Sequence, residues 1–284
     1  MINLQTVRLR LRLHRPEDGF YQGTRFDRSG VFDSLLYQGT ELCGRWFEQY
    51  DPCMHDAVCG PAEEFSPVFL PDGRILKIGV GLLLPDVQPY DRFHLYPVAD
   101  GGIWSMEETD SAMHFRHHLE GFYDYVKTVS LTGESAFEIR HELNAFTPLE
   151  GEVYNHNFFT LGKMSVGPSR TLDFPFTPEG TWRAAYDSIA FGLSGLRFSR
   201  PLEKGESVFT GNIHEKGSAG MPYRLTLSEG PLQVRISGDV PVLRTVFWSN
   251  HRIACPEPYN AFRAIPGKPF RWTVRYEILK SQGR

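Results

Sequence analysis

Apolar and polar side chains alternate regularly at both ends of the chain. Near the start the alternation sets Val7, Leu9, Leu11 and Leu13 against Arg8, Arg10, Arg12 and His14, and near the end it sets Phe270, Trp272, Val274, Tyr276 and Ile278 against Arg271, Thr273, Arg275 and Glu277. A period of two residues is typical of a β-strand that buries one face. We therefore predict that both ends form strands of antiparallel sheets with one face on the core.

Short strand-like runs recur between these two ends. The predicted strands are 30–37, 75–84, 92–98, 111–118, 122–131, 135–145, 152–160, 190–199, 221–227, 231–238 and 242–248. Turn-forming clusters separate them, among them Pro71-Asp72-Gly73, Asp100-Gly101-Gly102, Pro178-Glu179-Gly180 and Pro266-Gly267. Many short strands with such turns favour an antiparallel sandwich or barrel over βαβ units. Residues 181–190 are the one candidate helix.

The composition agrees with an all-β protein that has few helices. The 27 Gly, 20 Pro and 13% aromatic residues suit strands and turns. The chain of 284 residues shows no internal repeat, low-complexity tract or linker. One domain over 1–284 is the simplest prediction, because all-β domains often reach about 250 residues.

Charge and hydropathy argue against two classes of partner. With 30 Lys and Arg against 34 Asp and Glu, the chain offers no basic stripe for nucleic acid. No apolar run approaches the roughly 20 residues that span a membrane, and the start shows no secretory signal. The four cysteines lack C-x-x-C spacing, so free thiols in a reducing compartment are expected. These features predict a soluble, cytoplasmic protein; they do not indicate its oligomeric state.

A histidine flanked by two amides lies in the middle of the chain. His156 stands between Asn155 and Asn157 in the run YNHNFFTLG, residues 154–162. An imidazole at a strand end can be oriented through one ring nitrogen while the other faces a ligand. A histidine that bonds to backbone groups in a polar turn is the structural alternative.

A glutamate between two prolines lies near the C-terminal end. Pro256 and Pro258 restrict the backbone on either side of Glu257 and hold its carboxylate in place. Aromatic neighbours can desolvate the carboxylate and raise its basicity. The alternative is an exposed turn.

Together these runs resemble segments of the aldose 1-epimerase (mutarotase) family. Residues 232–261, LQVRISGDVPVLRTVFWSNHRIACPEPYNA, resemble the final strands, and Cys255-Pro256-Glu257-Pro258 is similar to the catalytic-glutamate signature of the hexose-6-phosphate mutarotase branch. YNHNFFTLG resembles the N-H-x-Y-F-N-L motif of the catalytic histidine. GVFDSLLYQGTEL and PGKPFRWTVRYEIL resemble the opening strand pair and the last strand. These segments follow the family order and span most of the chain.

The resemblance implies both a fold and a chemistry. The implied fold is a large antiparallel β-supersandwich of the galactose mutarotase-like type. The implied activity is interconversion of the anomers of a monosaccharide or sugar derivative without a cofactor, with Glu257 as base and His156 as acid. At neutral pH these roles require an ionised Glu257 and an at least partly protonated His156.

The chain departs from the family in its first half. Classical galactose mutarotases contact the sugar through a G-R-x-A-N-R segment, which has no match here; residues 54–65, MHDAVCGPAEEF, stand in its place. His55 is a candidate replacement for the family's second histidine. Glu63 and Glu64 are candidates to bind sugar hydroxyls, and a solvated acidic loop is the alternative.

Three further residues complete the candidate binding set. Arg25 can reach a sugar hydroxyl or a phosphate, or form a salt bridge with Asp27 or Asp33. Asn155 adjoins the candidate catalytic histidine. Trp248 is a candidate to stack on a sugar ring, as are Trp46 and Trp104, of which at most one is expected to do so.

A cluster of histidines resembles a metal site but does not suit one. On a strand His117 faces away from His114 and His118, and these two lie roughly 13 Å apart. We therefore predict no metal ion.

Three hypotheses for function follow. The first is an aldose 1-epimerase-like isomerase, for which His156 and Glu257 must meet in one concave site. The second is a carbohydrate-binding protein without catalysis on the same scaffold. The third is a glycoside hydrolase or polysaccharide lyase-related enzyme, since similar sandwiches occur in both.

Overall fold

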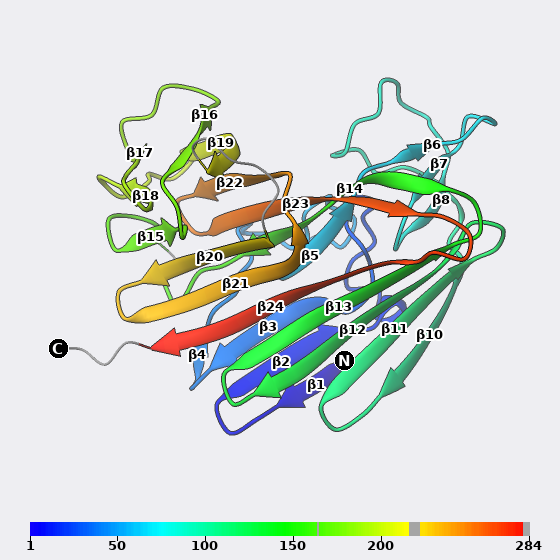
Figure 1. Cartoon of the computed structure of the whole chain (residues 1–284), viewed down its shortest axis with the longest axis horizontal. Coiled ribbons are helices and arrows are strands. Elements are labelled where there is room, and N and C mark those ends of the chain that lie inside the picture. Colours follow the sequence, from blue (N-terminus) through cyan, green and yellow to red (C-terminus); the bar gives the residue numbers. More distant parts are fainter. Residues whose placement is uncertain (164, 216–221, 281–284) are drawn as a thin grey trace.

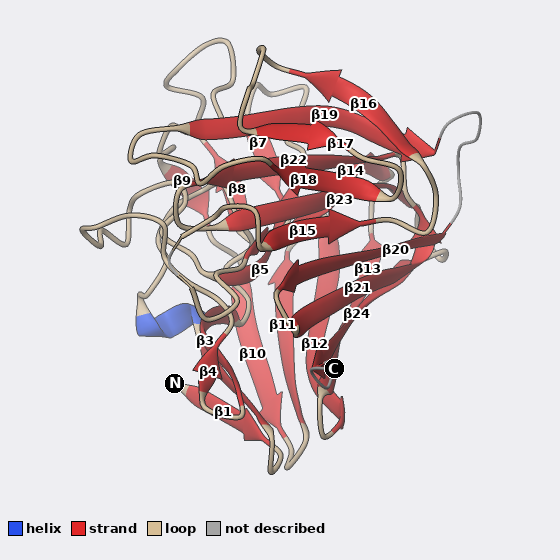
Figure 2. Cartoon of the chain, turned by 90° about the vertical axis from the view of Figure 1, so that its left-hand side faces the viewer, coloured by secondary structure: helices blue, strands red, loops and turns tan. Residues whose placement is uncertain are grey.

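Strands make up nearly all of the regular structure in the computed structural model, which describes residues 1–163, 165–215 and 222–280 (Figures 1 and 2). The helical structure in these ranges is one 3-10 turn, η1 (Pro16–Asp18). The strands form two large and two small sheets, and all pairs are antiparallel.

The largest sheet has ten strands. Their spatial order is β10 (Ile103–Glu108), β11 (Ala112–Leu119), β12 (Tyr123–Gly133), β13 (Ala136–Ala145), β24 (Phe270–Lys280), β21 (Leu232–Pro241), β20 (Pro222–Glu229), β15 (Arg170–Asp173), β18 (Gly195–Phe198) and β17 (Ile189–Phe191). The C-terminal strand therefore lies at the centre of the sheet, and its alternation in burial matches the predicted half-buried strand.

The second large sheet has six strands and carries the candidate residues His156 and Glu257. Its order is β16 (Pro178–Trp182), β19 (Ser207–Glu215), β22 (Arg244–Asn250), β23 (Ala254–Ala264), β14 (Leu149–Phe158) and β5 (Gly60–Phe65). The small sheets are β1 (Ile2–Gln5), β2 (Leu9–His14), β3 (Val31–Tyr37) and β4 (Thr40–Glu41), and β6 (Val68–Phe69), β7 (Ile75–Lys77), β8 (Gly81–Leu83) and β9 (Val98–Asp100).

The inner faces of the two large sheets pack against each other. Phe65 of β5 lies 5.5 Å from Tyr125 of β12 and 5.9 Å from Trp272 of β24, measured between ring centroids. Tyr276 of β24 donates a 2.9 Å hydrogen bond to Asn157 of β14. These contacts bury one face of each sheet, and the outer face of the six-stranded sheet is left to form a site.

The antiparallel β-architecture predicted from the sequence is confirmed, and six local predictions are wrong. Residues 75–84 and 190–199 each form a hairpin of two short strands, β7 with β8 and β17 with β18, instead of one strand. Residues 181–190 contain the end of β16 and the start of β17 instead of a helix. Residues 92–97 form no strand, and β9 begins only at Val98. Pro178-Glu179-Gly180 lies inside β16 at a register shift instead of in a turn. Val7 is 93% exposed in the turn between β1 and β2, because β1 ends at Gln5 and β2 begins only at Leu9.

Four further predictions concern residue 221, the number of domains, the cysteines and membrane spans. Residue 221, the first of the predicted strand 221–227, lies outside the described residues. The prediction of one domain over 1–284 stays a prediction. All four cysteines are free thiols, as expected. Within the described ranges, none of the helical structure is long and apolar enough to cross a membrane.

Candidate active site

Strand register sets His156 and Glu257 opposite each other. Strands β14 and β23 pair in one register from Tyr154 opposite Tyr259 to Phe159 opposite Ala254. Between these pairs the same register places His156 opposite Glu257. The two residues are 101 positions apart in the sequence, and adjacent antiparallel strands bring their side chains to one face.

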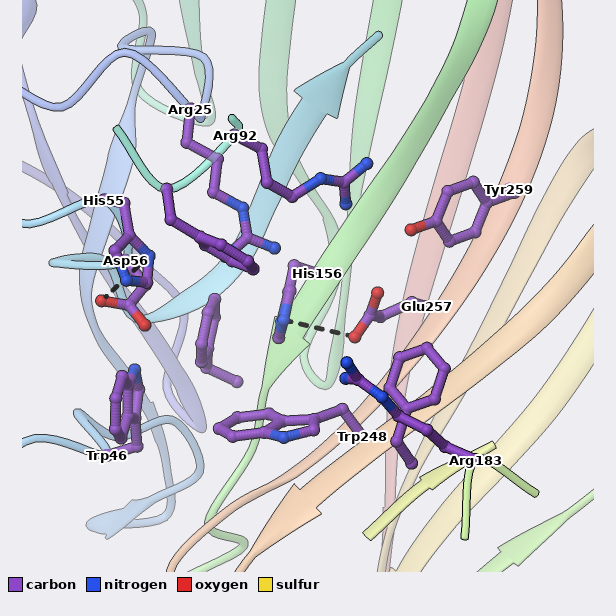
Figure 3. Close-up of a pocket in the computed structure, with 13 residues that line it drawn as sticks. Arg25, Trp46, His55, Asp56, Arg92, His156, Arg183, Trp248, Glu257 and Tyr259 are labelled. Atoms are coloured by element: carbon purple, nitrogen blue, oxygen red, sulfur yellow. Dashed lines mark ion pairs between the residues drawn. The ribbon is translucent and has the colours of Figure 1, made fainter. Parts of the chain in front are cut away.

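The two side chains form a close pair in the centre of a cavity (Figure 3). Nε2 of His156 lies 3.2 Å from Oε1 of Glu257, and both side chains are almost fully buried. The Pro-Glu-Pro segment is thus part of a buried strand and not an exposed turn. His156 likewise lies within a strand and not in a polar turn.

Burial controls the protonation of this pair. It raises the pKa of the Glu257 carboxyl to about 8, although Arg25 opposes the shift. Burial, with the charges of Arg25 and Arg92, lowers the pKa of His156 well below its ordinary value. Burial therefore favours the proton of the pair on the carboxyl at neutral pH. Both directions are opposite to the charge state expected from the sequence, an ionised Glu257 with a protonated His156.

The cavity around the pair has a volume of about 370 Å³, which lies within the range of small-molecule sites. Its aromatic walls are formed by Trp46, Phe93, Phe158, Phe209, Trp248 and Tyr259, and its polar groups are Arg25, His55, Asp56, Arg92, His156, Arg183 and Glu257. A cavity with apolar faces and a few convergent polar groups suits a sugar ring, which has both kinds of surface.

A buried carboxylate anchors two of the arginines. Nε of Arg25 donates to Oε2 of Glu64 over 2.6 Å, and Nε of Arg92 lies 3.5 Å from Oε1 of the same residue. The hydroxyl of Tyr154 also donates to Glu64, and it accepts hydrogen bonds from Arg25 at 3.0 Å and Arg92 at 3.3 Å. Arg25 is thus paired with Glu64 and not with Asp27 or Asp33, while part of its side chain still faces the cavity.

Strand alternation sends Glu63 and Asn155 away from the cavity. Asn155 lies opposite Glu63 in the β14–β5 pair and donates a 2.9 Å hydrogen bond to its Oε1. Lys127 and His141, both buried on the ten-stranded sheet, bind the same carboxylate. The cavity walls do not include Glu63, Asn155 or Glu64, and all three lie on buried strands instead of in a solvated loop. The sugar contacts expected of them therefore gain no support from this geometry.

The remaining candidates lie where a ligand can meet them. His55, Arg25 and Trp248 all line the cavity, as does Trp46. Trp104 instead stacks on His117, with 4.1 Å between ring centroids.

His114, His117 and His118 lie on β11 and bind different partners. Within the described residues no group of three or more His, Cys, Asp or Glu side chains is placed to hold a metal ion.

Seven residues of the cavity did not emerge from the sequence: three phenylalanines, Phe93, Phe158 and Phe209, and four residues with polar groups. Tyr259 follows Glu257 by two positions, so recognition of β23 as a strand would have placed both on one face. Asp56 adjoins the candidate His55. Arg92 and Arg183 lie in irregular connections, where no periodic signal indicates which way a side chain points.

No protein-family model and no curated protein matches this sequence. Solved structures do match. A galactose mutarotase related enzyme from Lactobacillus acidophilus is similar with a TM-score of 0.61 and 10% identity, over 100% of this chain and 98% of its own. The GalM/aldose epimerase homologue from C. elegans is similar with a TM-score of 0.59 and 13% identity, over 99% of each chain. The Slr1438 protein from Synechocystis sp. PCC 6803 follows, with a TM-score of 0.58 and 14% identity over 99% and 96%.

These likenesses confirm the galactose mutarotase-like fold. They extend over essentially the whole chain, in agreement with the family order of the sequence segments. At 10–14% identity a likeness shows the fold alone, so the chemistry has to come from the residues of the cavity.

Proposed function

We propose that this protein is an isomerase that interconverts the anomers of a sugar by opening and reclosing its ring. The observation that supports this most directly is the His156–Glu257 pair, with 3.2 Å between Nε2 and Oε1, in a cavity that suits a sugar ring. Proton transfer by such a pair needs no cofactor.

In the proposed mechanism Glu257 is the base and His156 the acid. Glu257 takes the proton from the C1 hydroxyl while His156 protonates the ring oxygen, the bond between C1 and that oxygen breaks, and C1 becomes a carbonyl. Rotation about the C1–C2 bond presents the other face of the carbonyl. Closure reverses both proton transfers, so the pair ends as it began.

One proton serves both directions of the reaction. For the roles proposed, the proton moves from the carboxyl to the imidazole across their 3.2 Å contact before the ring opens. Arg25 and Arg92 favour an ionised Glu257, and a sugar hydroxyl that donates to the carboxylate acts in the same direction.

The rate of exchange is expected to fall as pH rises through about 8. Below that pH Glu257 keeps the proton of the pair; above it the pair has no acid for the ring oxygen. The measurement is kcat/KM between pH 6 and 9.5, corrected for spontaneous exchange. A level rate below pH 7.5 and a loss of about tenfold per pH unit above 8 are expected. A rate that keeps rising to pH 9.5 contradicts the shared-proton mechanism.

Charge in the cavity favours an anionic sugar derivative as the substrate. Arg25 and Arg92 share one carboxylate, Glu64, and Arg183 has no ion pair within the described residues. Burial raises the pKa of Glu257 to about 8, so this carboxyl carries little negative charge at pH 7. Asp56, with a pKa of about 6, and Glu64 are then the carboxylates set against the three arginines. Guanidinium groups bind phosphate and carboxylate well, so we favour a sugar with one of these groups.

Replacing Arg183 by Gln is expected to raise KM for an acidic sugar by about tenfold, because one charge-assisted contact is lost. KM for a neutral sugar is expected to change less than twofold. Arg263→Gln is a matched control, since Arg263 is exposed and outside the cavity. Equal effects of Arg183→Gln on both sugars, or no effect on either, count against the anionic substrate.

The experiment that tests the function is anomer exchange measured by NMR. The wild-type protein is incubated with glucose, galactose, glucose 6-phosphate and glucuronate, and exchange is compared with the spontaneous rate. Acceleration of any of these sugars supports the isomerase. Sugar binding without acceleration supports a carbohydrate-binding protein, and new reducing ends or unsaturated products from oligosaccharides support a hydrolase or lyase.

A further inference from the structure

A second polar pair lies on the opposite side of the cavity from Glu257 (Figure 3). His55 and Asp56 are neighbours in the irregular segment before β5, and both line the cavity. The hydroxyl of Tyr21 donates a 2.8 Å hydrogen bond to the backbone oxygen of His55, which holds this segment in place. The ring of His55 packs on that of Phe93, with 4.8 Å between centroids.

The facing atoms of the two side chains lack hydrogen bonds. Oδ1 of Asp56 and Nδ1 of His55 are both sealed from solvent and neither has a hydrogen-bond partner. They lie 3.4 Å apart. The Asp56 side chain is only 8% exposed, and although Trp46 and the Asp56 backbone favour its ionised form, Oδ1 is left without a partner. A buried polar atom without a hydrogen bond destabilises a fold by about 1 to 3 kcal/mol. Packing alone therefore does not explain a carboxyl at this position.

We propose that Asp56 is the positioning residue of His55 and fixes which ring nitrogen of His55 meets the substrate. The carboxylate accepts a hydrogen bond from Nδ1–H of His55, so Nε2 keeps its lone pair. A contraction of the 3.4 Å contact by about half an ångström gives a charge-assisted hydrogen bond of ordinary length. The His55 side chain is 29% exposed, and its free nitrogen then accepts a hydrogen bond from a sugar hydroxyl.

The tautomer of His55 matters because this imidazole is neutral at physiological pH. Burial, with the charge of Arg25, lowers its pKa to about 4. A neutral imidazole has one donor and one acceptor nitrogen, and the partner of one nitrogen decides the role of the other. Only the identity of the ligand as a sugar rests on the proposed function; the pairing of Asp56 with His55 does not.

The pairing is tested by 15N NMR of the histidine side chains in the full chain, with His55→Gln to assign the signal. In the wild type the proton of His55 is expected on Nδ1. Asp56→Asn is expected to move it wholly or partly to Nε2, because an amide can donate to Nδ1 where a carboxylate cannot. A wild-type proton on Nε2, or an unchanged tautomer in Asp56→Asn, overturns the proposal. This readout needs no substrate, so it stands apart from a failure of the isomerase hypothesis.

A double-mutant cycle tests whether Asp56 acts through His55. Asp56→Asn is expected to lower kcat/KM for exchange at least tenfold when His55 is present, and less than twofold in a His55→Ala background. If no sugar is exchanged, the cycle is run on the Kd of a bound sugar. Equal losses in both backgrounds show a structural role of Asp56 and contradict the proposal. Thermal unfolding of each variant confirms that it is folded.

Discussion

The Glu257→Gln variant is expected to be more stable than the wild type and to lose about 10³-fold in the rate of anomer exchange. The loss follows because an amide cannot take the proton of the C1 hydroxyl, and acid–base groups contribute 10²- to 10⁴-fold. The gain in stability follows from burial, which raises the pKa of this carboxyl to about 8, whereas an unfolded glutamate has a pKa near 4.5. Keeping the group protonated in the fold destabilises it by on the order of 3 kcal/mol at pH 7.

The stability difference between Glu257→Gln and the wild type depends on pH. A carboxyl with a raised pKa in the folded state stabilises the fold most below pH 4.5, and this contribution is lost as pH rises through about 8. The gap between Glu257→Gln and the wild type is therefore expected to be small at pH 4.5 and largest at pH 8 and above. The measurement is urea unfolding at pH 4.5, 7 and 9, together with exchange kinetics at pH 7.

Glu63→Gln is a matched control for this prediction. Glu63 is also a buried glutamate of the six-stranded sheet, but it faces inward and is bound by Lys127, His141 and Asn155. Although burial alone would raise its pKa, these partners lower it to about 2, so Gln at this position is expected to destabilise the fold. If Glu257→Gln also destabilises the fold, or leaves exchange within tenfold of the wild type, the role given to Glu257 is wrong.

The largest loss of stability is expected from Lys127→Met. Nζ of Lys127 donates to the Ser29 carbonyl oxygen over 2.8 Å, binds Glu63, and lies 3.6 Å from Asp27, and its side chain is 1% exposed. Replacing Lys127 by Met leaves the buried carboxyls of Asp27 and Glu63 without the ammonium group that they share. Breaking a buried ion pair in this way costs about 3 to 5 kcal/mol. In a chain of this size that lowers Tm by roughly 10 °C.

Lys163→Met provides the comparison for Lys127→Met. Lys163 also binds a carboxylate, Glu229, at 2.6 Å, but its side chain is 57% exposed. Glu229 itself is buried, but it keeps its bonds to Arg170 and Ser169 when Lys163 is replaced. The loss of a solvated ammonium is expected to cost about 0 to 1 kcal/mol, so Tm should change by no more than a few degrees. The measurement is thermal unfolding followed by circular dichroism. Equal Tm values for both variants would show that the buried cluster does not stabilise the fold.

Strand periodicity could be read in many, but not all, of the strands that bury one face; β19 alternates in burial and was not predicted. The terminal strand from Phe270 alternates strictly, and its place in the sheet agrees with that pattern. Strand β5 was missed because all six of its residues are buried and no alternation marks it. Glu63 and Glu64 therefore looked like one acidic loop, although the strand sends one to the interior and the other toward Arg25.

The sequence by itself determined the all-β architecture and drew attention to His156 and Glu257, because both follow from local patterns of side chains and from motif order. Only the tertiary structure decided that these two residues face each other at 3.2 Å, that Asp56, Arg92 and Arg183 join them, and that burial raises the pKa of the carboxyl. The physical reason is that strand period depends on neighbouring residues, whereas burial and charge at a site depend on groups distant in the chain.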